Sequence, residues 1–314
     1  MSENELSLAT RAAWLHYGGG LSQTDVAKRL SVTKVKAHRL INRANQEGVV
    51  KVSFDGQVAE CAALELRLCQ QFGLSTCEVV PDLGEEGLPV RALGLGGAQF
   101  LAREIMNPEN TVIGLGNGRT LQSCIRHMSA MDAPGTTFVS LLGGLARNFA
   151  ANPYDVMHRL AEKTGAEAYF MPVPFFANSA DDRDVMLAQR GVPDVMAMAA
   201  RATLKLIGIG PVGPDAQTVV GGVVSAAAMD EVRASGGVGE VIGHFFDGEG
   251  RPVSTPLGDR RLSITIDGLA SGRVVAVAGG DDKVPAVLAI LKSGLLDGLI
   301  TDERSALALA SHES

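Results

Sequence analysis

The chain has 314 residues, of which 46% are hydrophobic and 20% charged, with a formal net charge of −7 at pH 7. This composition can bury a large core, and Gly, Pro or charge interrupts every apolar stretch before membrane-spanning length, which excludes a membrane-spanning protein. The N-terminus has neither the basic start nor the apolar core of a secretion signal, so we expect a cytoplasmic protein.

Charge divides unevenly along the chain. Residues 1–55 hold eight Lys or Arg against five Asp or Glu, a balance of +3, which leaves −10 on residues 56–314. A basic head on an acidic body confines attraction for a polyanion to one end. We therefore expect two domains, a head of residues 1–55 and a body of residues 56–314.

The head begins with a supporting helix in LATRAAWLHYGGG, and two amphipathic helical patterns follow in residues 21–45. Ser22 is a candidate N-cap of the first, with Asp25 in its first turn, and Thr33 is a candidate N-cap of the second. The inward positions of the second helix are expected to be Val35, Leu40 and Ile41. Two short helices joined by a tight turn predict a helix-turn-helix that binds DNA.

The outward positions of the second helix are basic, which favours a DNA-binding surface over an ordinary solvated helix face. In such domains the second helix reaches base edges, and flanking groups hold phosphates. The predicted base-contact set is Lys34, Lys36, His38 and Arg39, with Ser22, Gln23 and Thr33 on phosphates.

Two further elements complete the head and its junction. The segment EGVVKVSFDG predicts a short β-wing between Gly48 and Gly56. Residues 60–74 predict a connecting helix with an apolar stripe at Ala63, Leu66, Cys69 and Phe72, which can also pair with a second copy. The four cysteines have no zinc-type spacing, so we expect no metal site, and Cys69 and Cys77 keep a small chance of redox activity.

The body repeats one pattern, an apolar β-branched run followed by a glycine-rich turn and a helix. This alternation predicts an α/β domain with a Rossmann-like parallel sheet covered on both faces. Ligands of such sheets bind at the carboxyl ends of the strands.

Two glycine-rich turns are candidate ligand loops. The first runs through Gly116, Asn117, Gly118, Arg119 and Thr120, where a strand ends and a helix begins, so its amides can converge on an anion. The second, at Gly143 and Gly144, ends the next strand and supplies another wall. Tight turns without a ligand remain the alternative. The loop that begins at Gly116 does not follow the GxGxxG pattern, and no Walker A motif is present, so we expect no nucleotide cofactor.

Polar groups near later glycines are further candidates. Asp247 suits sugar hydroxyls and Lys283, at the start of a helix, suits a phosphate oxygen. His244 lies between a glycine and two phenylalanines, where a packed core histidine is favoured over an acid or base.

The motifs SQTDVAKRLSVTKVKAHRLINRANQEGVVKV, GLGNGRT, SLLGG, GHFFD, VAGGDDK and GLITDE, in this order, resemble the SorC family of sugar-responsive bacterial transcriptional regulators. The resemblance covers nearly the whole chain. RAAWLHY, KAHRLI and NFAANPYDVMHR are most similar to repressors of erythritol catabolism. The sequence departs from the common form at Asn117, where a bulky aromatic residue is usual, and at Lys34 and His38, where Arg and Ser are commoner.

The resemblance implies an effector domain related in fold to sugar-phosphate isomerases and deaminases, a phosphorylated sugar or polyol as effector, and assembly as a homo-oligomer, usually a tetramer. It assigns the phosphate loop to residues 116–120, the second wall to Gly143 and Gly144, and polar contacts to Asp247 and Lys283. Asn178 is a weaker candidate from the loop after the third strand.

Two functions remain open from the sequence. A regulator would bind operator DNA through the head and a sugar or polyol phosphate in the body. An enzyme would isomerise or deaminate a sugar phosphate, with Asp247 or Asp281 as base. The head favours the regulator, because an isomerase has no use for it.

Overall fold

The computed structural model describes residues 3–50, 58–144 and 156–312. Its first part is a helical group with a small hydrophobic core of its own, contributed mainly by alanines together with Val26, Leu40 and Ile41. The helices are α1 (Glu3–Ala13), which a π-helical turn (Trp14–Gly18) extends, α2 (Gln23–Arg29) and α3 (Lys34–Gln46).

Both predicted N-caps of this group are confirmed. The Ser22 hydroxyl accepts a hydrogen bond from the Asp25 amide at 3.3 Å, and the Thr33 hydroxyl accepts one from the Lys36 amide at 3.2 Å. Ser31 lies between the two helices with φ 53°, a left-handed conformation that permits the tight turn. The predicted wing extends into residues 51–57, which lie outside the described residues.

The expectation that Val35 faces the core is wrong. Its side chain is 69% exposed, whereas the inward positions of α3 are Ala37, Leu40, Ile41 and Ala44. These four positions repeat at helical spacing on the side of α3 away from Val35, so packing of small alanines against α1 sets the orientation of the helix.

The body is built on a parallel sheet of seven strands, as predicted, in the order β1-β11-β10-β5-β2-β3-β4. A smaller antiparallel sheet, β6-β7-β8-β9, was not predicted. The main sheet contains β1 (Thr76–Val80), β2 (Val112–Leu115), β3 (Thr137–Gly144), β4 (Ala168–Pro174), β5 (Leu204–Ile207), β10 (Arg273–Val277) and β11 (Gly298–Asp302); the small sheet contains β6 (Gly210–Pro211), β7 (Gly239–Val241), β8 (His244–Phe246) and β9 (Pro252–Val253).

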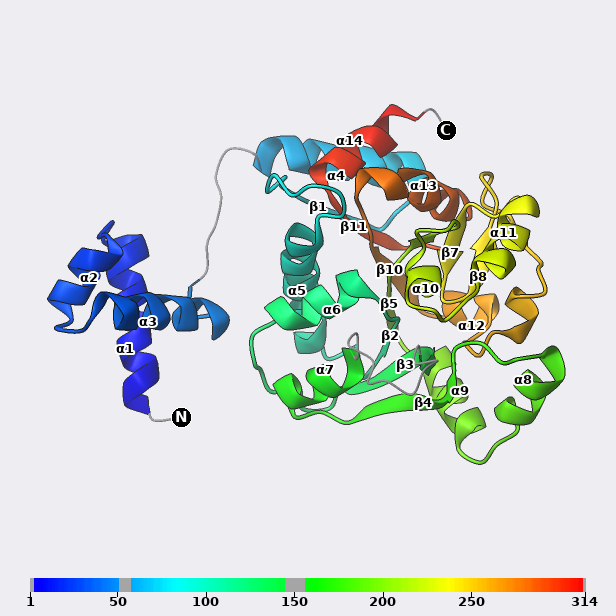
Figure 1. Cartoon of the computed structure of the whole chain (residues 1–314), viewed down its shortest axis with the longest axis horizontal. Coiled ribbons are helices and arrows are strands. Elements are labelled where there is room, and N and C mark those ends of the chain that lie inside the picture. The colour runs from blue at the N-terminus through cyan, green and yellow to red at the C-terminus, as the bar shows by residue number, and fades with distance from the viewer. Residues whose placement is uncertain (1–2, 51–57, 145–155, 313–314) are drawn as a thin grey trace.

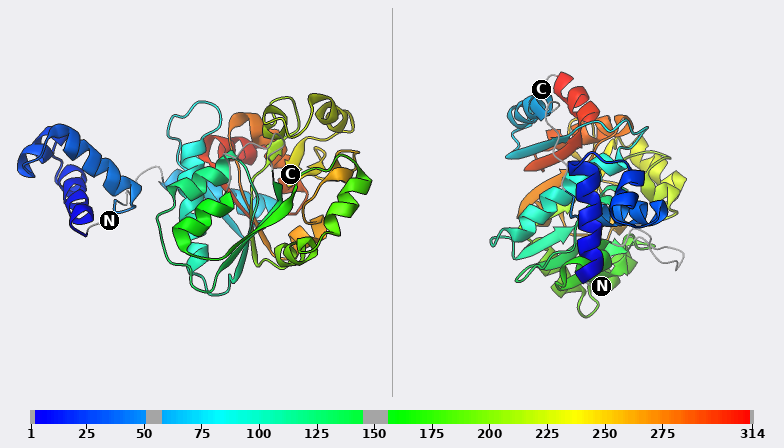
Figure 2. Two further views of the ribbon diagram at one scale, coloured as in Figure 1. Left: turned by 60° about the horizontal axis from the view of Figure 1, so that its bottom comes forward. Right: turned by 90° about the vertical axis from the view of Figure 1, so that its left-hand side faces the viewer.

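Helices cover both faces of the main sheet (Figures 1 and 2), with α5, α6 and α7 on one face and α9, α12 and α13 on the other. The helices of the body are α4 (Val58–Phe72), α5 (Val90–Met106), α6 (Arg119–His127), α7 (Val156–Thr164), α8 (Ala180–Leu187), α9 (Val192–Ala200), α10 (Gln217–Val220), α11 (Ala226–Ala234), α12 (Ile266–Ala270), α13 (Val284–Lys292) and α14 (Glu303–Ser311), with 3₁₀ turns at Gly258–Arg260 and Asp281–Lys283. No helix in these described ranges is long and apolar enough to cross a membrane.

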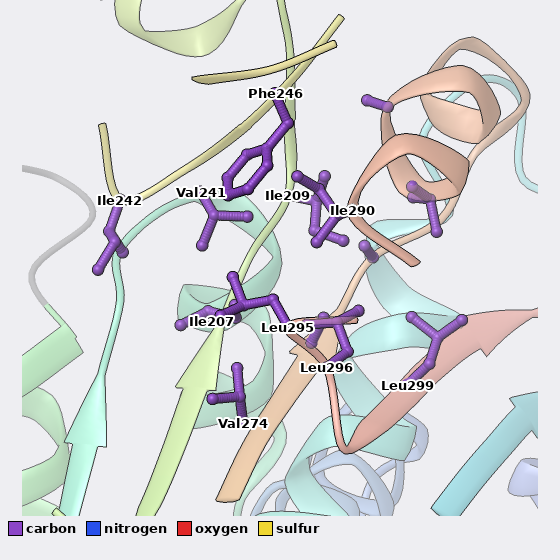
Figure 3. Packing of buried hydrophobic residues seen from close by; sticks show 14 of the residues in the cluster. Ile207, Ile209, Val241, Ile242, Phe246, Val274, Ile290, Leu295, Leu296 and Leu299 are labelled. Carbon is purple, nitrogen blue, oxygen red and sulfur yellow. The ribbon is translucent and has the colours of Figure 1, made fainter. Parts of the chain in front are cut away.

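Two hydrophobic clusters fill the space on either side of the sheet. In β10, Val274 and Ala276 belong to one cluster, while Val275 and Val277 belong to the other, because successive side chains of a strand point to opposite faces. Figure 3 shows the first cluster, in which Phe246 and Val241 of the small sheet lie above Ile207 and Val274. The small sheet is therefore packed on the main sheet rather than standing apart from it.

Helix α4 packs against β1 and α14, and the predicted apolar stripe is confirmed at Cys69 and Phe72, which pack against the core, but not at Ala63 and Leu66. Leu66 is 67% exposed and Ala63 is exposed, whereas Cys61 and Leu68 are buried. Burial raises the pKa of the Cys69 and Cys77 thiols, which disfavours the reactive thiolate at neutral pH.

The strand order reverses between β2 and β5. From β2 the chain proceeds through β3 to β4, and it then returns to β5 on the other side of β2 and continues to β10 and β11. In open parallel sheets, ligands bind at the carboxyl ends of the strands where the strand order reverses, which here are the ends of β2 and β5.

At the opposite ends of these strands, where they begin, an ion pair joins α5 to β10. The Glu104 carboxylate accepts from Arg273 at 2.9 Å and from the Asn110 side chain at 2.7 Å, and Glu104 is only 9% exposed. The Asn110 carbonyl oxygen in turn accepts from the Thr203 hydroxyl at 3.2 Å. This network therefore ties the start of β2 to the starts of β5 and β10.

Replacing Glu104 by Ala should lower the free energy of unfolding by about 2 kcal/mol, because a largely buried carboxylate is lost and two partners remain. Thermal and urea denaturation at pH 7 would measure the change. The matched control is Glu249→Ala, whose ion pair with Lys292 is mostly exposed and should contribute about 0.5 kcal/mol or less. Equal effects of the two substitutions would contradict this assignment.

Candidate functional site

The first candidate loop lies at the reversal point of the sheet. The Gly116 amide donates to the Leu206 carbonyl at 2.8 Å, which ties the end of β2 to β5. Gly118 is the N-cap of α6 and has φ 126° and ψ 173°, a conformation that only glycine adopts readily. A Cβ on Gly118 would meet nothing within 4 Å, so the loop borders open space.

The other residues of this loop have different surroundings. Thr120 is only 4% exposed, while Arg119 is exposed at the first position of α6. The Asn117 side chain accepts from the Gly118 amide at 2.7 Å, so this amide already has a partner in the structure. Of the four amides expected to converge, those of residues 117–120, the Gly118 amide is thus already engaged.

Lys283 lies beyond the end of β10 and reaches the end of β5. Its ammonium donates to the Ile209 carbonyl at 3.0 Å, just beyond β5. The preceding loop is held in place because the Gly280 amide donates to Asp302 at 2.9 Å and to Ser305 at 2.8 Å. The end of β11 thus fixes the backbone from which Lys283 extends.

Sequence reasoning missed Glu240. This residue lies in β7 opposite Gly210, and its carboxylate accepts a hydrogen bond from the Gly243 amide. A Cβ on Gly210 would come within 2.8 Å of the Glu240 carboxylate, so the absence of a side chain there makes room for it. No glycine-rich motif marks Glu240, and only the pairing of β6 with β7 reveals its position.

Arg119, Glu240 and Lys283 form one electrostatic group. Burial and the nearby Arg119 lower the pKa of Lys283 to about 8, and Glu240 opposes this shift. Burial raises the pKa of Glu240, while the Gly243 amide and Lys283 act in the opposite direction. Two cations and a carboxyl near a helix N-terminus are groups that suit an anion with neighbouring hydroxyls.

The second wall, formed by Gly143 and Gly144, is less accessible to a ligand than the sequence suggested. The Gly143 amide donates to the Leu262 carbonyl at 2.8 Å, and a Cβ on Gly143 would clash with the Pro174 carbonyl at 2.3 Å. Gly144 is exposed, and its carbonyl accepts from the Phe175 amide. Gly143 is therefore required for close approach of β3 to β4, and Gly144 alone faces outward. Leu145, Arg147 and Asn148 lie outside the described residues.

The expected ligand role of Asp247 is not supported by its surroundings. One carboxylate oxygen accepts from the Glu249 and Arg251 amides at 2.9 Å, and the other accepts from the Arg251 side chain at 2.9 Å. These bonds, led by that of the Arg251 amide, hold the pKa of Asp247 below its ordinary value. Asp247 thus stabilises the β8–β9 turn. The carboxyl group near Lys283 is that of Glu240.

Asn178 and His244 also lie away from this group of charges. Asn178 is exposed just before α8, and its backbone carbonyl accepts from Arg260 at 3.2 Å. His244 is 6% exposed and bonded to the Ile264 carbonyl at 2.9 Å, and burial lowers its pKa to about 4. It is a packed neutral histidine at pH 7, as expected.

The predicted contact residues of the first part of the chain share one surface. Lys34, Lys36, His38 and Arg39 are all exposed on α3. The His38 ring is hydrogen bonded to the Gln23 side chain at 3.2 Å and to the Asn42 side chain at 3.0 Å. These hydrogen bonds link α2 to α3. They also place Asn42 beside the predicted contact residues, among which the sequence analysis did not include it.

The profile of the sugar-binding domain family, Sugar-bind, matches residues 56–311. This chain belongs to that family. It is 54% identical over 309 residues to the erythritol catabolism regulatory protein EryD of Brucella abortus, covering 98% of each chain, and 34% identical over 315 residues to the transcriptional regulator LsrR of an Enterobacter species, covering 98% of this chain and 94% of that protein.

Solved structures of the family show the same fold. The full-length sorbitol operon regulator SorC from Klebsiella pneumoniae superposes with a TM-score of 0.76 at 22% sequence identity, covering 99% of this chain and all of that one. These relatives are transcriptional regulators and not enzymes, and nothing in the comparisons supports the isomerase or deaminase alternative. The chain is therefore a transcriptional regulator of the sugar-binding domain family.

Replacing Lys283 by Met should raise the free energy of unfolding at pH 7 by about 1 to 2 kcal/mol, because a poorly solvated charge is removed and one pKa unit corresponds to about 1.4 kcal/mol. The folded-state pKa of about 8 lies below the ordinary 10.5, so the unfolded chain holds more protons between these values. The stability of the parent should rise with pH in this window and approach that of the variant.

Chemical denaturation at several pH values from 7 to 10 would follow both proteins. A Lys283→Met protein that is less stable than the parent at every pH would show that the ammonium is well compensated in the unliganded site.

Proposed function

We propose that this regulator binds operator DNA through residues 1–55 and a phosphorylated sugar or polyol through residues 56–314. The second part is supported by the position of Arg119 at the N-terminus of α6, where the strand order reverses, and by the nearby charge of Lys283 beyond the end of β10. Two cations at a helix N-terminus suit a phosphate, and the Glu240 carboxyl suits a hydroxyl of the same molecule.

The head is proposed to be a winged helix-turn-helix. Its support is the capped pair α2 and α3, joined by residues 30–33, with four exposed basic or imidazole side chains on the second helix. In this arrangement Lys34, Lys36, His38 and Arg39 approach the major groove, and Ser22, Gln23 and Thr33 lie toward the phosphates. The charge balance of +3 over residues 1–55 supports the same assignment.

The effector is proposed to belong to erythritol metabolism, and the protein to act as a repressor that the effector releases from DNA. The support is the 54% identity to a regulator of erythritol catabolism along 98% of both chains. The relation of the effector domain to sugar-phosphate isomerases and deaminases is proposed on the same sheet architecture, with binding retained and turnover absent.

A homo-oligomer, a dimer or tetramer, is proposed because paired operator half-sites need paired heads. The exposed Leu66 of α4 and Leu307 of α14, on two helices that pack together, offer an apolar surface for such pairing. Binding to chromosomal operators would place the protein in the cytoplasm.

Replacing Lys36 and Arg39 singly by Ala should weaken specific DNA binding by about 1 to 3 kcal/mol each, the value of a good base contact. Fluorescence anisotropy with a duplex selected from a random library would measure this at matched salt. Effector-induced stabilisation should be unchanged in both variants, because neither position lies in the body. Parent-like affinity of both variants would contradict the assignment of α3.

Replacing Lys283 by Ala should remove the response to effector while DNA binding persists. Erythritol and its phosphates are the first ligands to test, by thermal shift and by release of the bound duplex. Loss of a charge-assisted contact should weaken phosphate binding by about 1.5 to 3 kcal/mol. Gly118→Ala should do the same, because φ 126° strains any other residue.

The control for this experiment is Lys292→Ala, which removes a lysine from the last turn of α13 and should leave the response unchanged. A Lys283→Ala protein that answers the same ligand at the same concentration would refute the site. Product formation from a sugar phosphate by the parent would instead support the enzyme alternative.

A further inference from the structure

Val35 stands at the centre of the outward face of α3. Successive residues of a helix are about 100° apart, so the buried positions Ala37, Leu40, Ile41 and Ala44 centre on the side directly opposite Val35. Its side chain is 69% exposed, as expected for a residue that takes no part in the core of the head. An aliphatic side chain here has no structural task.

The surroundings of Val35 are cationic and polar. Lys34 and Lys36 flank it on either side of the helix, and Arg39 and Asn42 follow on the same face one and two turns later. Helix α3 contains no Asp or Glu. This surface attracts a polyanion and has no apolar neighbours that would continue a protein contact, so the occupant it favours is duplex DNA.

The polar side chains on one side of Val35 are hydrogen bonded to one another, whereas the aliphatic side chain of Val35 forms no hydrogen bonds. His38 is hydrogen bonded to both Gln23 and Asn42, which steadies this side of the surface. Val35 is β-branched, and such side chains are restricted to one main rotamer in a helix. It therefore presents two methyl groups in a fixed direction.

The major groove offers one aliphatic group to such a side chain, the C5 methyl of thymine. We propose that Val35 determines part of the operator sequence by packing against a thymine methyl group. This inference rests on the proposed DNA binding of the head and adds to it the chemistry that one residue reads.

The test uses the full-length protein and a duplex selected from a random library. Each thymine of the selected duplex is replaced in turn by deoxyuridine, which pairs identically but lacks the methyl group. At one thymine in each half-site, the parent should bind the deoxyuridine duplex roughly fourfold more weakly, which corresponds to about 0.8 kcal/mol for one buried methyl-sized group. Val35→Ala should bind both duplexes equally.

Two matched variants separate this contact from general effects. Val220→Ala removes the same side chain at the same 69% exposure in α10 of the body, and it should keep the parent's preference for thymine. Lys34→Ala should weaken binding to the thymine and deoxyuridine duplexes equally, because an ammonium group does not distinguish them by the thymine methyl group. Val35→Ala itself should fold normally, because alanine favours an exposed helix position.

The outcomes are distinct. If no duplex is enriched from the library, the proposed DNA binding fails and this inference fails with it. If a duplex is enriched but Val35→Ala loses as much affinity as the parent on every deoxyuridine substitution, DNA binding stands and the role of Val35 is refuted. A Val35→Ala protein with altered self-association and unchanged thymine preference would assign the residue to a contact between copies and refute the inference as well.

Discussion

Burial of the central sheet on both faces is the constraint from which the rest of the body follows. Side chains of β2, β5 and β10 are packed on one side against α5 and α6 and on the other against α13 and the small sheet. A polar group has no low-energy place along these strands unless it is fully paired, as Lys205 is with the Ala202 carbonyl. Groups able to meet a ligand are consequently confined to the strand ends.

The same constraint explains why the charges of the site come from distant parts of the chain. Arg119 follows β2, Lys283 follows β10, and Glu240 belongs to a strand that packs above β5. Glu240 is bonded to the Gly243 amide and Lys283 to the Ile209 carbonyl, so the backbone holds both side chains. The site is preorganised by the sheet, and the electrostatic strain on Lys283 is sustained by the packed core beneath it.

The sequence predicted the parallel sheet and the two caps of the head because these depend on local patterns. Apolar runs ending in glycine located the strands, and Ser22 and Thr33 located the helix starts. It failed where a partner far along the chain decides the outcome. Glu240 carries no local motif, and only the pairing of β6 with β7 and the bond from the Gly243 amide show where its carboxylate lies.

The other source of error was the choice of which face of helices α3 and α4 turns toward the core. Val35 and Leu66 both fit an amphipathic pattern, yet both are exposed, because alanines and a cysteine supply the packed face instead. Small residues carry a weak hydrophobic signal but allow close approach of two helices. Their size, rather than their hydrophobicity, decided which face of α3 turned inward.

The bond between Lys283 and the Ile209 carbonyl has a consequence for selectivity. In the unliganded protein the backbone already supplies this ammonium with an acceptor, so any ligand enters in competition with the chain itself. A neutral hydroxyl offers little more than a carbonyl does, whereas a dianion offers a much stronger partner. In the proposed effector site, the carbonyl would therefore favour charged ligands over uncharged polyols.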